Sequence, residues 1–308
     1  MIIKKWRLKS AIIFFLVIFF IFINLNNNFN RNHKNIKMNN KVSVENFKAL
    51  PNDNNEDTLF IQKAIDHVAK DGGGTILFPK GTYLIDAIRS IVLRDNIILK
   101  FDKGTILKAL PNDKGSYEIV RIHGVKNASL TGNVVIEGER EEHIGEKGEW
   151  GFGVSIRGSE NILLENITIK NCWGDGIYIG STENKSYSKN ITINNPVLKN
   201  NQRQGISVIS VIKLKIVNPF ISDTKGKAPE SGIDLEPNNP MERLESVEII
   251  NPFTENNNGT GLLINLKYLH GSKYSVSIKV YDVKNVKDGI QIVKPRNIKG
   301  TVEIIKVY

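Results

Sequence analysis

The sequence predicts a parallel β-solenoid, an all-β fold in which short strands wind into stacked coils. Three observations support this: a recurring glycine followed by alternating apolar residues, a second apolar strand pattern between these glycines, and Asn, Gly or Pro turns between the strands. The glycine-led strings begin at positions 153, 176, 205, 232, 261 and 289, so each repeat is 23 to 29 residues long. Repeats of this length, with no room for helices between the strands, are typical of solenoid coils.

The two strand patterns explain why the coils should stack. The glycine-led strings include "GIYIG", "GISVI" and "GIDLE", and strings such as "NITINNPVLKNN" lie between them. Both alternate with a period of two, so each unit of two or three strands has an apolar inner face that only neighbouring coils can bury. The Asn residues between strands suit turns with left-handed backbone. A β-sandwich is the competing fold, but sandwiches lack such regular internal similarity.

A helix is expected over residues 57–70, in "DTLFIQKAIDHVA" and the residue after it. Asp57 is a suitable N-cap, and "DGGG" ends the segment. The end of a solenoid exposes an apolar core, so this amphipathic helix should cover the N-terminal coil with a stripe of apolar side chains. The stripe consists of Ile61, Ala64, Ile65 and Val68.

Composition argues against a nucleic-acid-binding protein. The chain has 308 residues and a formal net charge of +10, but residues 1–40 hold seven Lys or Arg and no acid. The remainder has 35 basic and 32 acidic residues and is therefore nearly neutral. A basic footprint of the kind that binds nucleic acid is missing from it. The single Cys172 allows no internal disulfide, so packing must stabilise the body.

The first residues have the pattern of an export or anchoring segment. A basic string, "KKWRLK", precedes the apolar run of residues 11–25, and no small-x-small cleavage site follows. We predict a signal peptide or N-terminal membrane anchor over residues 1–28, a polar linker over 29–41 and a solenoid domain over 42–308. The body should then be extracytoplasmic, either secreted or held at the membrane by this segment alone.

Several strings resemble a known superfamily. "DTLFIQKAIDHVAKDGGGTILFPKGTYLI" looks like the opening of the pectate-lyase-like superfamily, which includes rhamnogalacturonase and epimerase-like groups. "NCWGDGIYIG", "NQRQGISVIS" and "ESGIDLEPN" resemble its polygalacturonase-related bacterial branch. The resemblance runs from about residue 42 to the C-terminus. It implies a single-stranded right-handed parallel β-helix with an N-terminal capping α-helix, an architecture that hosts hydrolases, lyases, epimerases and non-catalytic adhesins.

Period-two geometry sorts the glycine-led strands into inward and outward residues. One outward column should comprise Ser155, Tyr178, Ser207, Asp234, Leu263 and Gln291. The next should comprise Arg157, Gly180, Ile209, Glu236, Asn265 and Val293. Polar and aromatic residues precede the strands and should flank the first column: Trp173, Asp175, Arg203, Gln204 and Glu230.

These columns predict a groove that binds a sugar chain, with catalytic carboxyls. Asp234 is the expected central group, with Asp175 or Glu236 as its partner. Asp175 and Asp234 should lie about 9 to 10 Å apart along the backbone, and Asp234 and Glu236 about 6 to 7 Å. Inverting glycosidases hold their carboxyls about 6.5 to 9.5 Å apart, so either pair favours inversion over retention.

The remaining candidates are expected to bind substrate. Arg203 should bind the carboxylate of an acidic sugar, and aromatic rings should stack on sugar rings. An insertion at residues 137–151 lies where it could wall the groove. The full set comprises Arg203, Tyr178, Trp173, Gln204, Asn238, Trp150 and His143.

Other functions stay open because the pattern departs from polygalacturonases. The chain has Gly-Asp-Gly at 174–176 and no Gly-His-Gly. A polysaccharide lyase or epimerase is an alternative and would need a base such as Tyr178 or Arg203, together with Arg or a cation such as Ca²⁺ to neutralise a carboxylate. Asp234, Glu236 and Glu230 offer oxygen ligands for Ca²⁺, but no compact ligand loop is visible, so no metal site is predicted. A non-catalytic carbohydrate-binding surface protein or adhesin is the other alternative. The sequence gives no prediction of oligomeric state.

Overall fold

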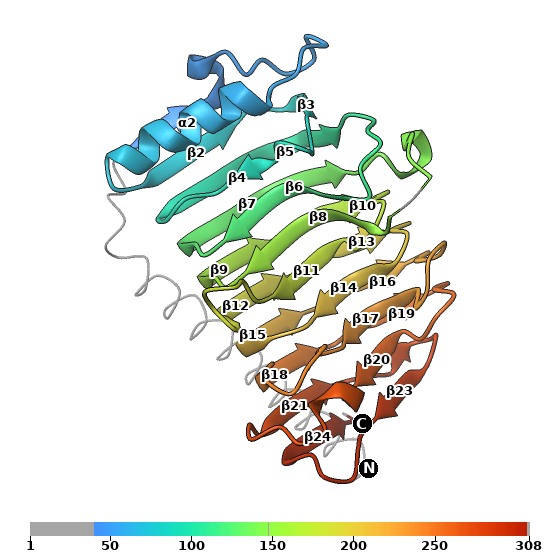
Figure 1. Ribbon diagram of the computed structural model, residues 1–308. Coiled ribbons are helices and arrows are strands. Elements are labelled where there is room, and N and C mark those ends of the chain that lie inside the picture. The colour runs from blue at the N-terminus through green and yellow to red at the C-terminus, as the bar shows by residue number, and fades with distance from the viewer. Residues whose placement is uncertain (1–39, 147, 307–308) are drawn as a thin grey trace, which may run out of the picture. The chain divides into compact units, whose positions relative to one another are not determined.

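The computed structural model describes residues 40–146 and 148–306. In this part the chain is an all-β stack of coils with one α-helix, α2 (Thr58–Lys70). Every paired strand runs parallel to its neighbours within the described residues. Figure 1 shows the coils following one another in chain order, with α2 beside the first of them. The predicted parallel β-solenoid is therefore confirmed.

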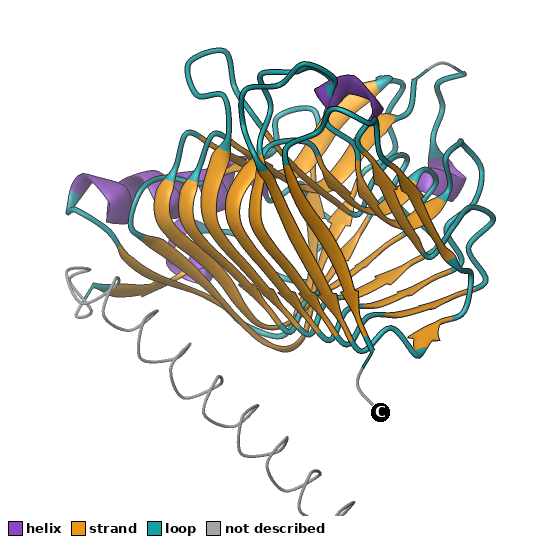
Figure 2. Cartoon of the chain, turned by 90° about the horizontal axis from the view of Figure 1, so that it is seen from below, coloured by secondary structure: helices purple, strands orange, loops and turns teal. Residues whose placement is uncertain are grey.

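The larger sheet has 16 strands and forms two walls of the stack, which Figure 2 shows from another side. The long strands β5 and β7 bend and so belong to both walls. Its strands are β1 (Lys41–Ser43), β2 (Gly74–Phe78), β3 (Gly81–Ile85), β5 (Ile97–Ala109), β7 (Lys126–Glu137), β9 (Glu160–Glu165), β10 (Thr168–Lys170), β12 (Ser188–Asn194), β13 (Val197–Lys199), β15 (Val211–Val217), β16 (Phe220–Ser222), β18 (Leu244–Ile250), β19 (Phe253–Glu255), β21 (Val276–Tyr281), β22 (Asn285–Val286) and β24 (Gly300–Ile305).

The smaller sheet has eight strands and holds the glycine-led repeats. Its order is β23-β20-β17-β14-β11-β8-β6-β4, so strands separated by a full coil are direct neighbours. A typical coil therefore has three strands, such as β12, β13 and β14. The strands are β4 (Ile91–Val92), β6 (Ser116–His123), β8 (Trp150–Arg157), β11 (Ile177–Gly180), β14 (Gln204–Val208), β17 (Ser231–Leu235), β20 (Leu262–Asn265) and β23 (Ile290–Val293). Three short 3-10 helices complete the elements: η1 (Val44–Phe47), η2 (Arg140–Glu142) and η3 (Lys267–Leu269).

The core lies between the two sheets and follows the predicted alternation. The inward residues of the glycine-led strands, for example Ile206 and Val208, are fully buried. Each inward residue stacks on its counterpart one coil away, since Ile206 pairs with Ile177 and with Ile233. Stacking at about 4.8 Å per strand thus removes a continuous apolar column from water.

Asparagine ladders hold the corners of the coils. Asn127, Asn161 and Asn190 have φ values of 56, 58 and 54°, in the left-handed region. Each donates its side-chain amide to the Asn one coil earlier, as in the 2.9 Å bond from Asn161 to Asn127 and the 2.7 Å bond from Asn190 to Asn161. Asparagine tolerates this backbone conformation better than most residues. The left-handed backbone and the side-chain hydrogen bonds between coils therefore both explain why the turns contain Asn.

The helix α2 buries the predicted stripe, since Ile61, Ala64, Ile65 and Val68 are fully buried. Its N-cap differs from the expectation, because the Asp57 side chain makes no capping bond. The Asp57 carboxylate instead accepts the backbone amides of Leu50 and Leu84, and the Glu56 carboxylate accepts the amide of Thr58. Asp57 thus fastens the first coil to the helix.

The predicted leader over 1–28 and most of the linker over 29–41 lie outside the described residues. Strand β1 already begins at Lys41, at the last position of that predicted linker. Within 40–146 and 148–306, no helix is both long and apolar enough for a membrane span.

Candidate functional site

The outward side of the smaller sheet carries the predicted columns; we call it the polar face, with Ser155, Tyr178, Ser207 and Asp234 as its central row. Strand pairing aligns Ser155 with Tyr178, Tyr178 with Ser207, and Ser207 with Asp234. The register of the first column is as predicted. Exposure differs from the expectation, because Ser155, Ser207 and Asp234 are at most 2% exposed. Neighbouring side chains cover these groups, so the row is outward but desolvated.

Asp175 and Arg203 are paired with each other. Nη1 of Arg203 lies 3.2 and 3.1 Å from the two carboxylate oxygens of Asp175, and the Ser207 hydroxyl donates at 2.7 Å to Oδ2. Asp175 is fully buried, which raises the pKa of its carboxyl, while Arg203 and Ser207 act in the opposite direction. Nε of Arg203 also lies 3.8 Å from the carboxylate of Glu149. These contacts occupy both side chains, so Arg203 has little free charge for a substrate carboxylate.

Asp234 and Glu236 form a carboxyl pair at the end of β17. Asp234 is 1% exposed and accepts a 2.6 Å hydrogen bond on Oδ2 from Nε2 of Gln204. Burial raises the pKa of Asp234 to about 8, and the negative charge of the neighbouring Glu236 adds to the rise. Desolvation and a nearby like charge both favour the protonated form of a carboxyl.

Other side chains fix the two members of this pair differently. The amide of Ser231 donates at 3.1 Å to Oε1 of Gln204, which orients its amide nitrogen toward Asp234. Nδ2 of Asn265 donates at 2.8 Å to Glu236, which is only partly buried. Asp234 is therefore the desolvated member that keeps the proton, and Glu236 is the member that faces solvent.

The raised pKa of Asp234 predicts a stability that falls with rising pH. Between about pH 4 and pH 8 the folded chain keeps this proton, whereas the unfolded chain, with the ordinary pKa of 3.8, releases it. The stabilisation is complete below pH 4 and is lost as the pH rises through about 8. We expect denaturant midpoints measured at about pH 5 and about pH 9 to differ more for the wild type than for Asp234→Asn. Equal differences in the two proteins would contradict the assignment of this proton.

The insertion at residues 137–151 places His143 out of reach of a substrate. Its side chain is fully buried, and Nδ1 lies 3.1 Å from the Glu139 carboxylate. Its ring stacks on Trp173 with centroids 4.0 Å apart. The prediction that His143 binds substrate finds no support in this position, because the buried Glu139 carboxylate, which also bonds Asn112 and Tyr117, draws the ring inward. One face of Trp173 is covered for the same reason, whereas Trp150 stays 48% exposed.

Tyr178 lies in the middle of the polar face and contacts both an aromatic ring and a guanidinium. The Phe152 ring stacks on it at 4.9 Å, and the Arg157 guanidinium lies 4.1 Å from the Tyr178 centroid and 5.6 Å from that of Phe152. Burial raises the pKa of the Tyr178 hydroxyl. The pKa of Arg203 is raised as well: burial lowers it, but Asp175 outweighs that effect. Both bases considered for a lyase thus move away from neutral pKa.

The remaining predicted positions lie at the edge of the face. Asn238 is exposed, and its backbone amide donates to the carboxylate of Glu242. The Glu230 carboxylate accepts from the amide of Gly226 at 2.5 Å and from Nδ2 of Asn258 at 3.2 Å. The Ca²⁺ hypothesis finds no support in these contacts, and the described residues contain no cluster of three His, Cys, Asp or Glu that could hold a metal ion.

A hollow of about 370 Å³ opens at the turn after β8, with Gly158, Lys185 and Tyr187 in its lining. Neither Asp234 nor Glu236 lines this hollow. The groove over the carboxyl pair stays a prediction.

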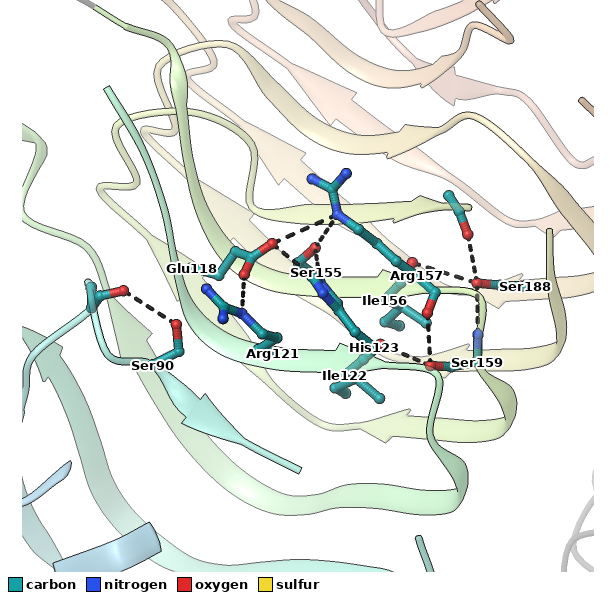
Figure 3. Close-up of polar contacts among 12 residues, drawn as sticks. Ser90, Glu118, Arg121, Ile122, His123, Ser155, Ile156, Arg157, Ser159 and Ser188 are labelled. Atoms are coloured by element: carbon teal, nitrogen blue, oxygen red, sulfur yellow. Dashed lines mark hydrogen bonds and ion pairs between the residues drawn. The ribbon is translucent and has the colours of Figure 1, made fainter. Parts of the chain in front are cut away.

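The polar face extends one strand further toward the N-terminus than the sequence indicated. Strand β6 adds Glu118, Arg121 and His123, and Figure 3 shows their side chains gathered with Ser155 and Arg157. Arg121 pairs with Ser155, and His123 with Arg157. The sequence repeat missed them because β6 has no leading glycine and Arg121 precedes its partner by 34 residues, beyond the 23 to 29 of the other coils. The alternation in "EIVRIH" was the available signal.

Fold and face together define a right-handed parallel β-helix protein whose polar face carries clustered acids, guanidinium groups and aromatic rings. A family model described as a right-handed β-helix region matches residues 80–265. The chain belongs to this family, and the predicted membership of a right-handed parallel β-helix superfamily is confirmed.

Three similar proteins illustrate the relationship. The uncharacterised protein YclG of Bacillus subtilis (strain 168) is 30% identical over 214 residues, which cover 61% of this chain and 36% of YclG. An iota-carrageenase complexed to iota-carrageenan fragments aligns with a TM-score of 0.60 and 16% identity over 83% of this chain and 54% of that one. Tailspike gp49 of Acinetobacter baumannii bacteriophage Fri1, a capsular polysaccharide depolymerase, aligns at 0.57 and 14% identity over 87% and 47%. The two structures share the fold with this chain, which spans about a third of the length of the curated relatives it matches.

Proposed function

We propose that this chain acts on polysaccharides and is a glycoside hydrolase for an acidic polysaccharide. The observation that carries the proposal is the desolvated carboxyl of Asp234, which is 1% exposed, bonds Gln204 at 2.6 Å, and has a pKa raised to about 8 by burial. A carboxylic acid with a pKa near the working pH is the group that a glycosidase needs to protonate a leaving oxygen. The polysaccharide-acting neighbours of the same fold are consistent with this class of substrate.

Asp234 is the proposed general acid. Its proton passes to the glycosidic oxygen as the bond to the anomeric carbon breaks, and the resulting Asp234 carboxylate is stabilised by the hydrogen bond from Gln204. Glu236 is the proposed general base, which takes a proton from the attacking water, because it is the solvent-facing member of the pair. We assign Asp175 a structural role, since its carboxylate accepts hydrogen bonds from Arg203 and Ser207.

Inversion at the anomeric carbon is the proposed stereochemical outcome. An inverting pair needs about 6.5 to 9.5 Å between its carboxyls. Asp234 and Glu236 lie at i and i+2 of one strand, about 6 to 7 Å apart along the backbone, which favours the inverting range. Retention needs about 5 to 5.5 Å, so identifying the first anomer released decides between the two.

A lyase or epimerase is the second reading of this fold. It is less well supported because the pKa values of Tyr178 and Arg203 are both raised. A non-catalytic carbohydrate-binding role would leave the raised pKa of Asp234 without a function.

One assay separates these functions. We expect the chain to release new reducing ends from an acidic polysaccharide in a panel of plant, algal and bacterial polymers, with no increase in the ultraviolet absorbance of an unsaturated sugar. The rate should fall as the pH rises through about 8, because Asp234 then loses its proton. Absorbance with the reducing ends would indicate a lyase, and binding with neither signal would indicate an epimerase or a binding protein.

Location is a separate proposal. We propose that residues 1–28 export the chain or anchor it, so that the β-helix works outside the cytoplasm, where polysaccharides are found. Fractionation of cells that produce the whole chain and a chain starting at residue 29 tests this. Retention of both in the cytoplasm would exclude it.

A further inference from the structure

A charged cluster lies on the polar face away from the carboxyl pair. It comprises Glu118, Arg121 and His123 of β6, and Ser155 and Arg157 of β8. The Glu118 carboxylate is at its centre, 2.5 Å from Nε of Arg121, 3.1 Å from Nε2 of His123 and 3.6 Å from Nε of Arg157 (Figure 3). The Ser155 hydroxyl lies 3.1 Å from Nε2 of His123 and 3.0 Å from Nε of Arg157.

This arrangement is not built for nucleophilic catalysis. Glu118 and the Ser155 hydroxyl both contact the same nitrogen of His123, whereas a Ser-His-acid triad uses the two different ring nitrogens. We therefore infer the function of the cluster from its charge.

The charge of the cluster is positive. Burial raises the pKa of Glu118, but His123 and Arg121 outweigh burial and lower it to about 2, so the carboxylate is ionised near neutral pH. Two guanidinium groups then face one carboxylate. The side chains of Arg121 and Arg157 are 36% and 28% exposed, whereas that of Glu118 is 9% exposed. The positive surplus is thus on the solvent side.

The contacts of both arginines use Nε and leave the ends of the guanidinium groups available. No hydrogen bond joins the terminal nitrogens of Arg121 or Arg157 to the rest of residues 40–146 and 148–306. In Figure 3 the dashed lines from Arg121 and Arg157 begin at Nε and not at these nitrogens. Arg157 is also held over the Tyr178 ring at 4.1 Å, so its plane is fixed before a ligand arrives. A fixed guanidinium edge suits bidentate binding of a planar or tetrahedral anion.

Tyr178 connects this cluster with the carboxyl pair. Its ring lies across Gly180, where a Cβ atom would come within 2.8 Å of the ring. Gly180 pairs with Arg157, so the absence of a side chain there lets the ring reach the guanidinium. Three strand spacings separate β8 from β17, which is about 14 Å. A sugar chain that lies across the strands would therefore contact both groups.

We propose that Arg121 and Arg157 bind an anionic substituent of the polysaccharide, a carboxylate or a sulfate ester, at about three to four strand spacings from Asp234. This rests on the proposed polysaccharide substrate but not on hydrolysis. The sequence predicted Arg203 as the anion-binding residue, but Arg203 forms ion pairs with Asp175 and Glu149. The proposed site instead uses arginines whose terminal nitrogens form no hydrogen bond within the described residues. Glu118 and Ser155 act as positioning residues.

Binding measurements on the full chain carrying Asp234→Asn test the proposal without turnover. The probes are polygalacturonate for carboxylates, iota-carrageenan for sulfate esters, and dextran as a neutral polymer. We expect one anionic polymer to bind, with an affinity that falls with salt, and Arg157→Gln to weaken it about 10- to 100-fold. Arg157→Lys should recover only part of the loss, because an ammonium lacks the planar fork.

Arg243→Gln is the matched control, because Arg243 also bonds a carboxylate, that of Glu245, and lies 4.2 Å from the centroid of Tyr274, but outside the polar face. It should leave affinity unchanged. Equal binding of dextran, no binding of either anionic polymer, or equal affinities for Arg157→Gln and Arg243→Gln would overturn the proposal. If Arg157-dependent binding is found but no reducing ends are released by the wild type, the hydrolase proposal fails and the anion site stands.

Discussion

Asp234→Asn is expected to lower the rate of polysaccharide cleavage by about 10²- to 10⁴-fold, the range that a general acid contributes. The amide has the shape of the carboxylic acid and keeps a carbonyl oxygen for the 2.6 Å bond from Gln204, so the fold should be retained. It cannot deliver a proton to the leaving oxygen. Initial rates of reducing-end release, with thermal unfolding measured in parallel, provide the comparison.

Asp282→Asn serves as the control for this change. Asp282 is 8% exposed, follows β21, and lies outside the polar face. The same loss of a buried acid there should leave cleavage at the wild-type rate. A rate for Asp234→Asn within a few-fold of this control would exclude Asp234 as the proton donor.

Asp175→Asn is expected to lower the free energy of unfolding by about 3 kcal/mol. Removing one partner of a buried ion pair costs about 3 to 5 kcal/mol, because the other charge remains without compensation. We expect the lower end of this range because the Arg203 side chain is 18% exposed and its Nε lies 3.8 Å from the Glu149 carboxylate, so its charge stays partly compensated. Urea denaturation at constant pH measures the difference.

The double variant Asp175→Asn with Arg203→Met provides the control, since it removes both charges. We expect it to regain most of the lost stability, as neutral replacements of buried pairs often do. If Asp175→Asn keeps the wild-type midpoint and loses only activity, Asp175 is a catalytic group and its assignment to structure is wrong.

The register of the fold was open to prediction because it depends on local periodicity. Alternating apolar residues fix which side of a strand faces inward, and the recurring glycine fixes which residues stack. The column from Ser155 through Tyr178 and Ser207 to Asp234 followed from these two facts alone. Strand β6 escaped the same reasoning because its coil is longer and has no leading glycine.

The pairing of charged side chains was not open to prediction from periodicity. The repeat predicts that Asp175 and Arg203 lie on neighbouring coils. Side-chain rotation decides whether they face a substrate or each other. In the structure they form an ion pair at 3.1 Å. The same holds for His143, since nothing local indicates that the buried carboxylate of Glu139 would draw its ring against Trp173.

Periodicity in the chain was enough to predict a stack of parallel coils and the residues that share its outward columns, because backbone hydrogen bonding and apolar alternation repeat along the chain. Which outward groups are desolvated became known only from the folded chain. There Asp234 is 1% exposed with a raised pKa, and the hydrogen bonds of Arg121 and Arg157 use Nε. Desolvation and ion pairing could not be predicted because they depend on loops and coils that meet only when the chain is folded.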